Sequence, residues 1–298
     1  MFDEFKNAFQ RTNNGHVQLI IINVVVFLVL ALFFVLLKVS QLPEIFDAIH
    51  HNIAIPAPIL EFFQKPWTLI TYAFVHDWTG IFHILFNMVV FYWFGKLFIE
   101  YLGSDKLIAV YFLGAIAGAV AYLLVYNLIP FYEARIPSGG MVGASAAVYA
   151  IVIATATLLP DYTFFLLFLG PVRIKYIAAF YIVISFLGSV GPNEGGNVAH
   201  LGGALIGFLY VKQLQAGVNW GSWITATIDW IKSLFAPKQN VKVTYRKEAT
   251  AKKTSTVSKT SLISQDEIDT ILDKISDGGY ESLSKEEKEK LFNASKNR

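Results

Sequence analysis

The chain has 298 residues, of which 55% are hydrophobic and only 15% are charged, and its mean hydropathy is positive. The apolar residues gather in long runs instead of recurring at amphipathic spacing, which predicts a membrane protein that crosses the bilayer several times. The absence of cysteine excludes disulfides, thiolate nucleophiles and cysteine-ligated metal sites. The formal net charge of +2 says nothing about orientation in the membrane until the basic residues are assigned to individual loops.

Six runs have, or approach, the roughly 20 apolar residues per helix that a hydrocarbon core of about 30 Å requires. They cover residues 17–38, 81–99, 106–129, 143–159, 172–190 and 199–215. The first run is too long for a signal-peptide core, and no small-residue cleavage site follows it, so we expect it to be retained. The pattern predicts an all-α polytopic protein, a bundle of six transmembrane helices.

The basic residues set the expected orientation, because Lys and Arg concentrate in cytoplasmic loops. Lys6 and Arg11 precede the first run. Lys96 and Lys106 flank the turn between the second and third runs, and Arg173 and Lys175 lie between the fourth and fifth. The opposite loops carry fewer basic residues, mixed with acidic ones. We therefore expect both termini in the cytoplasm, with residues 1–16 preceding a membrane domain over residues 17–215.

The stretch between the first two runs, residues 39–80, is too apolar for a solvated loop and too interrupted to span. Trp67, Tyr72 and Trp78 suit the headgroup level, where amphipathic aromatic rings collect. We expect this stretch to lie partly in the membrane interface. An ordinary extracytoplasmic loop with scattered aromatic residues is the alternative.

Three segments follow the last run. Residues 216–236 place Trp and Ile at helical spacing, which predicts an interfacial amphipathic helix. Residues 237–263 have the composition of a flexible basic linker that can touch anionic lipid headgroups. Residues 264–298 predict a small cytoplasmic helical hairpin, because they contain two capping-box patterns. These patterns are Ser264 with Glu267 and Ser284 with Glu287.

Polar side chains inside apolar helices are costly and are therefore functional candidates. With a cytoplasmic N-terminus, the second, fourth and sixth runs all cross inward from the outer face. Their first turns carry His83 and Asn87, then Ser145, then His200. Topology alone therefore predicts that these four side chains lie at one depth, just below the extracytoplasmic surface.

Ser145 and His200 are the candidate nucleophile and base. A neutral imidazole within hydrogen-bond reach can remove the hydroxyl proton and then protonate a leaving amine. No Asp or Glu falls at that depth within the runs, so the sequence favours a Ser–His dyad over a triad. His83 and Asn87 share one helix face, where they and the Ser145 backbone N–H are candidate donors for an oxyanion hole.

Neighbouring residues support the dyad. Tyr149 lies one turn after Ser145 and is expected to stack on His200. Small residues favour close approach of the fourth and sixth helices. They are Gly143 and Ala146 beside the serine, and Gly203 and Gly207 after the histidine.

Each feature has an alternative explanation. A serine between small residues in a membrane helix often serves only packing, and a histidine at a helix end is often an interfacial group. His83 and Asn87 can also bridge helices by hydrogen bonding. The joint placement on three helices is what favours an active site.

No metal or cofactor is expected. The chain has no HExxH pair, no carboxylates accompany the histidines, and no Gly-rich phosphate loop or basic aromatic surface indicates nucleotide or nucleic acid. His76 is expected to help orient the loop before His83. His50 and His51 fall in the long loop, where solvated positions are expected, and His16 precedes the first run.

At these residues the chain resembles a rhomboid intramembrane serine protease, over roughly residues 60–210. Residues 83–87 resemble the family's HxxxN motif, residues 143–146 its GxSG motif, and residues 199–207 its AHxxGxxxG segment. Together these motifs are specific.

The resemblance has two departures. Ala146 stands where GxSG has its second glycine, and it adds a methyl where the fourth and sixth helices should touch. Thr68 follows Trp67 where many members of the family carry arginine.

The resemblance implies that Ser145 is the nucleophile, His200 the general base and acid, and Tyr149 the ring that stacks on this base, with His83 and Asn87 stabilising the oxyanion. The implied activity is hydrolysis of peptide bonds in or near transmembrane segments, with release of an extracytoplasmic fragment. The expected partners are transmembrane protein substrates and membrane lipids, not nucleic acid. We expect a multi-pass protein of the bacterial inner membrane whose active site opens to the extracytoplasmic side.

The resemblance also implies that substrates enter sideways near the fifth helix, past Phe86. Hydrolysis needs water at a site below the surface, so we expect a polar cavity that opens outward, with the glycine-rich residues 191–196 as its mobile cap. Two alternatives are a non-catalytic rhomboid-like protein that binds transmembrane helices and a small transporter. The presence of Ser145 and His200 argues against the first. The absence of charged residues at the bilayer midplane argues against the second. The oligomeric state stays open.

Overall fold

The computed structural model describes residues 11, 13–77, 80–235 and 265–296. It divides into two compact units, Met1–Pro237 and Lys238–Arg298, and each is described separately. The predicted linker over residues 237–263, together with Trp78 and Ser264, lies outside the described residues.

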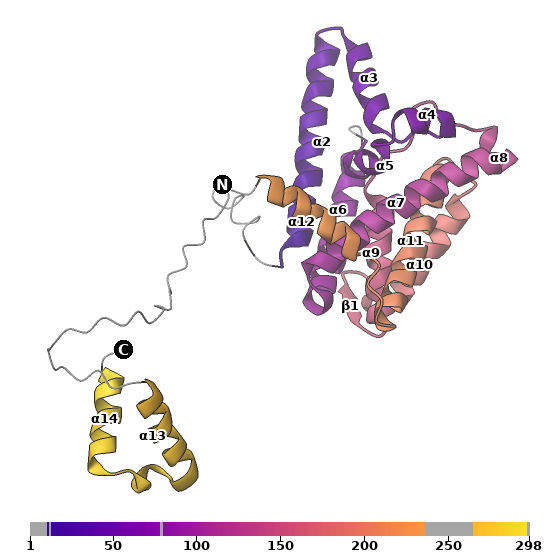
Figure 1. Cartoon of the computed structure of the whole chain (residues 1–298). Coiled ribbons are helices and arrows are strands. Elements are labelled where there is room, and N and C mark those ends of the chain that lie inside the picture. Colours follow the sequence, from indigo (N-terminus) through magenta and orange to yellow (C-terminus); the bar gives the residue numbers. More distant parts are fainter. Residues whose placement is uncertain (1–10, 12, 78–79, 236–264, 297–298) are drawn as a thin grey trace. The chain divides into compact units, whose positions relative to one another are not determined.

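The first unit is mostly helical (Figure 1). Its longer helices are α2 (Gly15–Val39), α3 (Pro43–Ile53), α6 (Ile81–Leu102), α7 (Ser104–Leu128), α9 (Ser145–Leu158), α10 (Ile174–Gly188), α11 (Glu194–Gln215) and α12 (Ser222–Phe235). Its short elements are α4 (Ile59–Gln64), α5 (Thr68–Thr71), the 3₁₀ turn η1 (Tyr72–Phe74) and α8 (Pro130–Glu133).

Six of these helices, α2, α6, α7, α9, α10 and α11, coincide with the six apolar runs. Among the described residues, α2, α6 and α7 are long and apolar enough to cross a bilayer, while α9 and α10 are shorter apolar helices. Helix α2 exposes Leu28 and Leu32 at 58% each. Such exposure of large apolar side chains is unfavourable in water and is the expected surface of a helix in lipid. The chain is therefore an integral membrane protein.

A two-stranded hairpin, which the all-α prediction did not contain, connects α9 to α10. Strand β1 (Thr163–Leu166) pairs antiparallel with β2 (Gly170–Arg173). Gly170 has φ of +70°, a conformation that glycine adopts without a Cβ penalty and that closes the turn. The sequence contains no strand signal there, because residues 163–169 are a nearly continuous apolar stretch without polar alternation.

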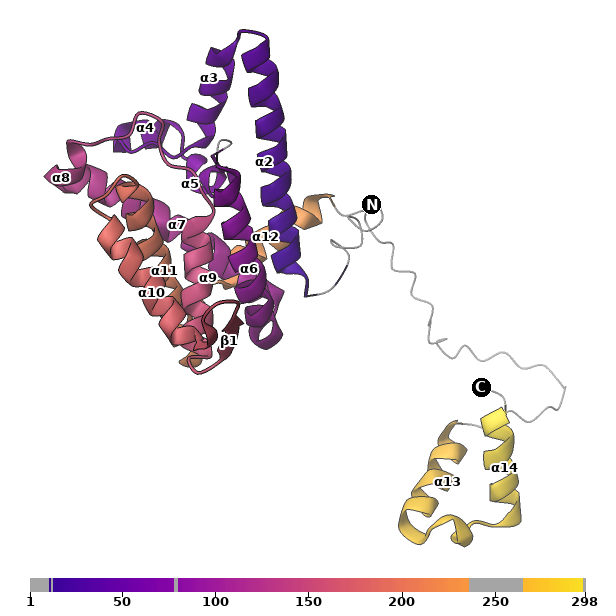
Figure 2. The same cartoon turned by 180° about the vertical axis from the view of Figure 1, so that it is seen from behind.

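Helix α9, which begins with Ser145, lies at the centre of the unit and contacts α6, α7, α10 and α11 (Figure 2). Glycines on α11 permit one of these approaches. A Cβ built on Gly203 would lie 2.1 Å from the Ala146 carbonyl oxygen, and one on Gly207 would lie 2.2 Å from that of Ala150. Only glycine fits at these two positions, as the spacing of small residues predicted.

A second glycine pair, overlooked in the sequence, lies on the other side of α9. Cβ atoms built on Gly114 and Gly118 of α7 would each lie 2.5 Å from an alanine methyl of α9, those of Ala150 and Ala146 respectively. The extra methyl of Ala146 is therefore accommodated by Gly118 on the third membrane helix. We expected this methyl at the contact between the fourth and sixth helices, but the atoms of Ala146 that lie nearest to Gly203 belong to its backbone.

This packing predicts a size-dependent effect on stability. Gly118→Ala should lower the stability of the protein by roughly 1–3 kcal/mol, because the new methyl overlaps that of Ala146 in a packed interface. Adding Ala146→Gly should recover part of the loss. Thermal unfolding in detergent measures both changes. Gly139→Ala is the control, because no atom lies within 4 Å of a Cβ built there; equal unfolding temperatures for the two single alanine variants would contradict the packing.

The stretch before α6 is more ordered than an interface loop. The Trp67 indole N–H donates to the Asn52 carbonyl (2.8 Å) with its side chain half exposed, which suits an interfacial ring. Tyr72 is different: it is only 1% exposed, and its hydroxyl donates to the Ala115 carbonyl of α7 (2.6 Å). The expectation of an interfacial Tyr72 was therefore wrong, since this side chain anchors the stretch to the bundle.

Helix α12 falls within the residues predicted to form an amphipathic helix. Trp223, Trp230 and Leu234 are exposed, while Ile224 is buried. Gly221, just before the helix, packs closely on Ala109 of α7. One end of α12 is thus attached to the bundle and leaves a row of large apolar side chains uncovered, as an interfacial helix requires.

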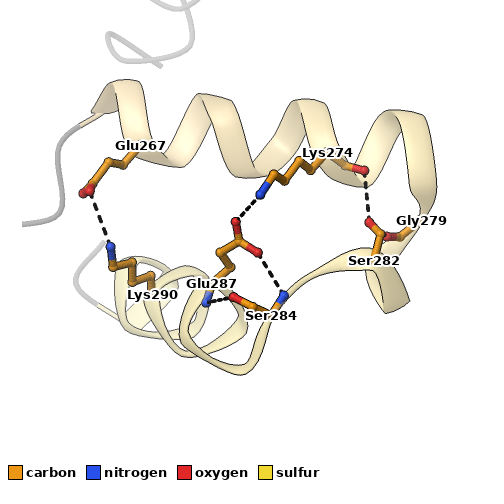
Figure 3. Close-up of polar contacts among 7 residues, drawn as sticks. All are labelled: Glu267, Lys274, Gly279, Ser282, Ser284, Glu287 and Lys290. Atoms are coloured by element: carbon orange, nitrogen blue, oxygen red, sulfur yellow. Dashed lines mark hydrogen bonds and ion pairs between the residues drawn. The ribbon is translucent and has the colours of Figure 1, made fainter.

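The second unit is a helical hairpin of α13 (Gln265–Gly278), the 3₁₀ turn η2 (Tyr280–Ser282) and α14 (Lys285–Lys296). Ser284 and Glu287 form a reciprocal capping box: the Ser284 N–H donates to the Glu287 carboxylate (2.9 Å), and the Glu287 N–H donates to the Ser284 hydroxyl (3.3 Å). Lys274 of α13 donates to the same carboxylate (Figure 3). Glu287 therefore joins the two helices and caps one of them.

Glu287 gives this unit a pH dependence. Its hydrogen bonds from Lys274 and Ser284 lower the pKa of the carboxyl from its usual value to about 2. The resulting stabilisation is present above the unfolded pKa and is lost as the pH falls through the folded value. The circular dichroism of the separate Lys238–Arg298 segment should therefore lose helix between pH 4.5 and 2 in part through Glu287. Glu287→Gln should have less helix at pH 5 and a flatter profile; an unchanged profile would contradict this role.

Candidate active site

Ser145 is the first residue of α9, and the segment before it is held by earlier parts of the chain. Ile55 and Met141 exchange backbone hydrogen bonds of 3.0 and 2.9 Å, and the Gly143 N–H donates to the Tyr72 carbonyl (3.0 Å). Because it begins the helix, Ser145 has a backbone N–H without an intrahelical acceptor. The preceding contacts fix the directions of both this N–H and the side chain.

His200, on α11, meets Ser145 across the helix interface. The His200 Nε2 atom lies 2.7 Å from Ser145 Oγ. The imidazole also stacks on the Tyr149 ring, with a centroid distance of 4.2 Å and an interplanar angle of 12°. This stack restricts rotation of the imidazole. A hydroxyl and a ring nitrogen from different helices are thus within direct proton-transfer distance.

The other nitrogen of His200 contacts a residue that the sequence analysis overlooked. Ser185, on α10, has its Oγ 3.2 Å from His200 Nδ1 and donates a hydrogen bond to the Tyr149 hydroxyl (2.9 Å). Its side chain is fully buried. The rule that singled out Ser145, a polar side chain inside an apolar run, also applies to Ser185. In the described part of the chain, no carboxylate forms an ion pair with His200.

Asn87 supplies an unused donor beside the dyad. Its Nδ2 atom is buried and has no hydrogen-bond partner among the described residues. A buried donor without a partner is unfavourable by roughly 1–3 kcal/mol. Such a group is expected where a ligand oxygen completes the hydrogen bond. Asn87 lines the same cavity as Ser145 and His200.

Gly143 and His83 border the space beside the Ser145 hydroxyl. A Cβ built on Gly143 would lie 3.4 Å from Ser145 Oγ and 3.6 Å from His83 Cε1. The φ of Gly143 is +142°, a backbone conformation that residues with a Cβ atom rarely adopt. The glycine thus leaves room for a small group between the hydroxyl and the imidazole, where an oxyanion would need its donors.

Two cavities meet at Ser145 and His83. The larger, of about 810 Å³, has a wall of polar and glycine-rich segments, and the smaller, of about 440 Å³, lies between α6 and α10. Polar residues of the larger include Asp77, Tyr122, Tyr126, Arg135 and Glu194. Apolar residues of the smaller include Phe82, Phe86, Val90 and Val148. The reactive pair therefore has a polar space on one side and an apolar space on the other.

Two positions differ from the prediction. Asn87 and His200 lie in the second turns of their helices, because α6 begins at Ile81 and α11 at Glu194. Residues 194–196, expected in a loop, form the first turn of α11.

The Glu194 carboxylate, in this first turn, is buried and accepts a hydrogen bond from the Tyr126 hydroxyl (3.4 Å). An acidic side chain in a first turn is favoured by the helix dipole.

His76 lies beside the site and outside the six helices. It is buried, and its ring centroid is 5.5 Å from that of His83 in an edge-on arrangement. Burial, and to a smaller extent His83, lowers the pKa of His76 to about 4. A neutral imidazole at physiological pH therefore packs behind His83, which agrees with a role in orienting this segment.

The other histidines are away from the dyad. His16 lies in the first turn of α2 and is buried. Burial lowers the pKa of His50, which is half-buried and not solvated as expected. His51 pairs with Glu61 at 2.8 Å. Among the described residues, no group of three His, Asp or Glu side chains could hold a metal ion.

The site residues fall within a region that matches a known family. The model of the Rhomboid domain matches residues 64–215, and a family of unknown function, DUF6576, matches residues 258–297. The first match includes Ser145, His200 and their neighbours. The second corresponds to the tail unit and assigns it no activity.

The curated relatives that the chain matches are also rhomboid-like proteins. RHOMBOID-like protein 12, mitochondrial, of Arabidopsis thaliana is 32% identical over 163 residues, which cover 50% of this chain and 47% of the relative. Rhomboid-like protein 16, chloroplastic, of the same plant is 29% identical over 164 residues, 50% of this chain and 49% of the relative. The chain spans about half the length of the curated relatives it matches. With the Rhomboid domain covering half of its residues, the chain belongs to the rhomboid family.

Proposed function

We propose that this protein is a serine-type intramembrane endopeptidase that cleaves peptide bonds in or near transmembrane segments of other membrane proteins. The observation that carries the proposal is the 2.7 Å contact between Ser145 Oγ and His200 Nε2. The unpaired donor of Asn87 beside it and the membership of the rhomboid family support the same activity.

The dyad performs the reaction in two halves. Ser145 Oγ attacks the scissile carbonyl carbon while His200 Nε2 takes the hydroxyl proton. His200 then gives this proton to the leaving amine, and an acyl group remains on Ser145. A water molecule, deprotonated by the same imidazole, attacks this ester and releases the second product. The return of the proton to Ser145 restores the starting state.

In this proposal, three donors stabilise the negative oxygen of the tetrahedral intermediates. They are the Ser145 backbone N–H at the start of α9, the Asn87 Nδ2 amide and the His83 imidazole. Donors held in place before the reaction need no reorganisation, and each typically contributes roughly 10²–10³ in rate. This function gives the unpaired Asn87 amide its missing partner.

The two cavities suit the two reactants. The larger cavity carries Glu194 and tyrosine hydroxyls and would supply water to a site surrounded by apolar helices. The smaller cavity, with Phe82 and Phe86 on α6 and Tyr181 on α10, would admit an apolar segment sideways from the lipid. Exposure of Phe86 at 65% leaves this side chain available to contact such a segment.

The proposal includes a topology. Helices α2, α6, α7, α9, α10 and α11 cross the membrane with both termini in the cytoplasm, and the active site opens to the extracytoplasmic side. The basic residues at the inner ends support this orientation. The matched relatives are named as mitochondrial and chloroplastic proteins, so they lend no support to a bacterial inner membrane, which stays a prediction.

The alternatives remain a non-catalytic rhomboid-like protein that binds transmembrane helices and a small transporter. A binding protein has no need for a serine and a histidine in direct contact or for a buried unpaired amide beside them. A transporter would be expected to carry charged side chains near the membrane midplane. The dyad geometry therefore favours the protease.

Cleavage of reporter proteins tests the function. The protein is reconstituted in liposomes with a panel of single-span reporters whose transmembrane segments differ in sequence, and fragments are identified by mass spectrometry. We expect cleavage at one defined bond by the wild type and none by His200→Ala. Intact reporters that bind both proteins with equal affinity would instead support the binding protein.

A further inference from the structure

In the part of the chain that the structure describes, one polar side chain, Ser185, contacts Nδ1 of His200, the imidazole nitrogen that does not face Ser145. It comes from α10, whereas the dyad comes from α9 and α11. Its Oγ is fully buried, lies 3.2 Å from His200 Nδ1 and is 2.9 Å from the Tyr149 hydroxyl. A buried hydroxyl with two polar contacts is a defined part of the site and not a chance neighbour.

The direction of the hydrogen bonds follows from the number of protons. A serine hydroxyl has one hydrogen to donate, and that of Ser185 is donated to the Tyr149 hydroxyl. For the Ser145 hydroxyl to donate to His200 Nε2, as a nucleophile must, the proton of the neutral imidazole lies on Nδ1 and is donated to Ser185 Oγ. His200 Nε2 is left as the acceptor for the Ser145 hydroxyl, which is the tautomer that a general base requires.

We propose that Ser185 is a positioning residue of the catalytic dyad, which holds His200 in the Nδ1-protonated tautomer and stabilises the imidazolium formed when Ser145 is deprotonated. This inference rests on the proposed protease function. It assigns to an uncharged side chain the place that a carboxylate occupies in a Ser–His–Asp triad.

Tyr149 thereby has two separable roles. Its ring stacks on the imidazole, and its hydroxyl accepts from Ser185. The ring restricts where His200 lies, and the hydroxyl chain fixes which nitrogen carries the proton. Tyr149→Phe removes the second role and keeps the first, so it should show a weaker form of the Ser185→Ala effect.

The test compares reporter cleavage by the wild type, Ser185→Ala and Ser189→Ala across pH. Ser189 is the control because its hydroxyl lies at the end of the same helix and, among the residues that the structure describes, donates only to the Phe186 carbonyl. For Ser185→Ala we expect kcat to fall roughly tenfold, the equivalent of one hydrogen bond, with KM unchanged. The acid limb of the pH–rate profile should move to lower pH, because the imidazolium has lost an acceptor. Ser189→Ala should match the wild type.

A Ser185→Ala protein with wild-type kcat and an unmoved acid limb would overturn the proposal. So would a loss of activity that appears only as a smaller folded fraction or a higher KM, since a purely structural serine would give that result. Nitrogen-15 NMR of labelled His200 reads the tautomer independently of cleavage. Protonation at Nδ1 in the wild type, redistributed in Ser185→Ala, supports the proposal even if the reporters are not cleaved, whereas a wild-type proton on Nε2 contradicts it.

Discussion

Replacement of Ser145 by alanine is expected to reduce reporter cleavage by roughly 10⁶-fold, which is the scale at which removal of a serine nucleophile leaves only binding and oxyanion stabilisation. The variant should fold normally, because alanine keeps the helical start of α9 and the small volume that this position requires. Its affinity for an uncleaved reporter should equal that of the wild type, since the hydroxyl acts on the reacting carbonyl. The rate of product formation in liposomes measures the effect.

The control for this substitution is Ser189→Ala, which removes a hydroxyl from the end of α10 without a contact to His200. It should cleave at the wild-type rate. His200→Ala should be impaired on the same scale as Ser145→Ala, and the double variant should be no worse than either, because the two side chains act as one unit. Independent, multiplying losses would contradict a dyad.

Replacement of Asn87 by alanine is expected to lower kcat by roughly 10²–10³ and to leave KM nearly unchanged. The reason is that the Asn87 amide is unpaired in the free protein and finds its acceptor only when negative charge develops on the substrate oxygen. Asn87→Asp should be impaired at least as strongly, because it replaces the donor by an acceptor of similar shape. Steady-state kinetics with a reporter of known cleavage site separate kcat from KM.

The matched control is Asn52→Ala, since Asn52 is exposed and its amide donates, within the described residues, only to the Ala48 carbonyl one turn away. Its kinetics should not change. An Asn87→Ala protein that lost affinity and kept its kcat would assign this side chain to substrate binding. Thermal unfolding should show Asn87→Ala to be no less stable than the wild type, because the substitution removes an unsatisfied buried group.

Much of the bundle could be predicted from the sequence because lipid imposes one strong condition, a long apolar run for each helix. The six runs coincide with six helices, and the contact of Ser145 with His200 follows from their positions near the N-terminal ends of α9 and α11, which run in the same direction. The start of α11 was placed too late. Its first turn contains Glu194 and two glycines, a composition that locally favours a loop.

Other features depended on tertiary contacts. Tyr72 has the amphipathic character of an interfacial ring, yet a carbonyl of α7 satisfies its hydroxyl inside the bundle. Gly114 and Gly118 have the four-residue spacing of a helix-packing motif, but the sequence does not say that Gly118 faces the methyl of Ala146. Ser185 was visible as a polar residue in an apolar run, but its contact with His200 depends on the rotation of α10, which hydropathy does not specify.

The most direct test of the dyad is the site and rate of labelling by a fluorophosphonate, which reacts with activated serine hydroxyls. In detergent, the wild type should gain one phosphonyl group, located on Ser145 by mass spectrometry of its peptides. His200→Ala should label far more slowly and Ser145→Ala not at all, although both contain every other serine of the chain. Equal labelling of the three proteins, or a label on a serine other than Ser145, would contradict the account.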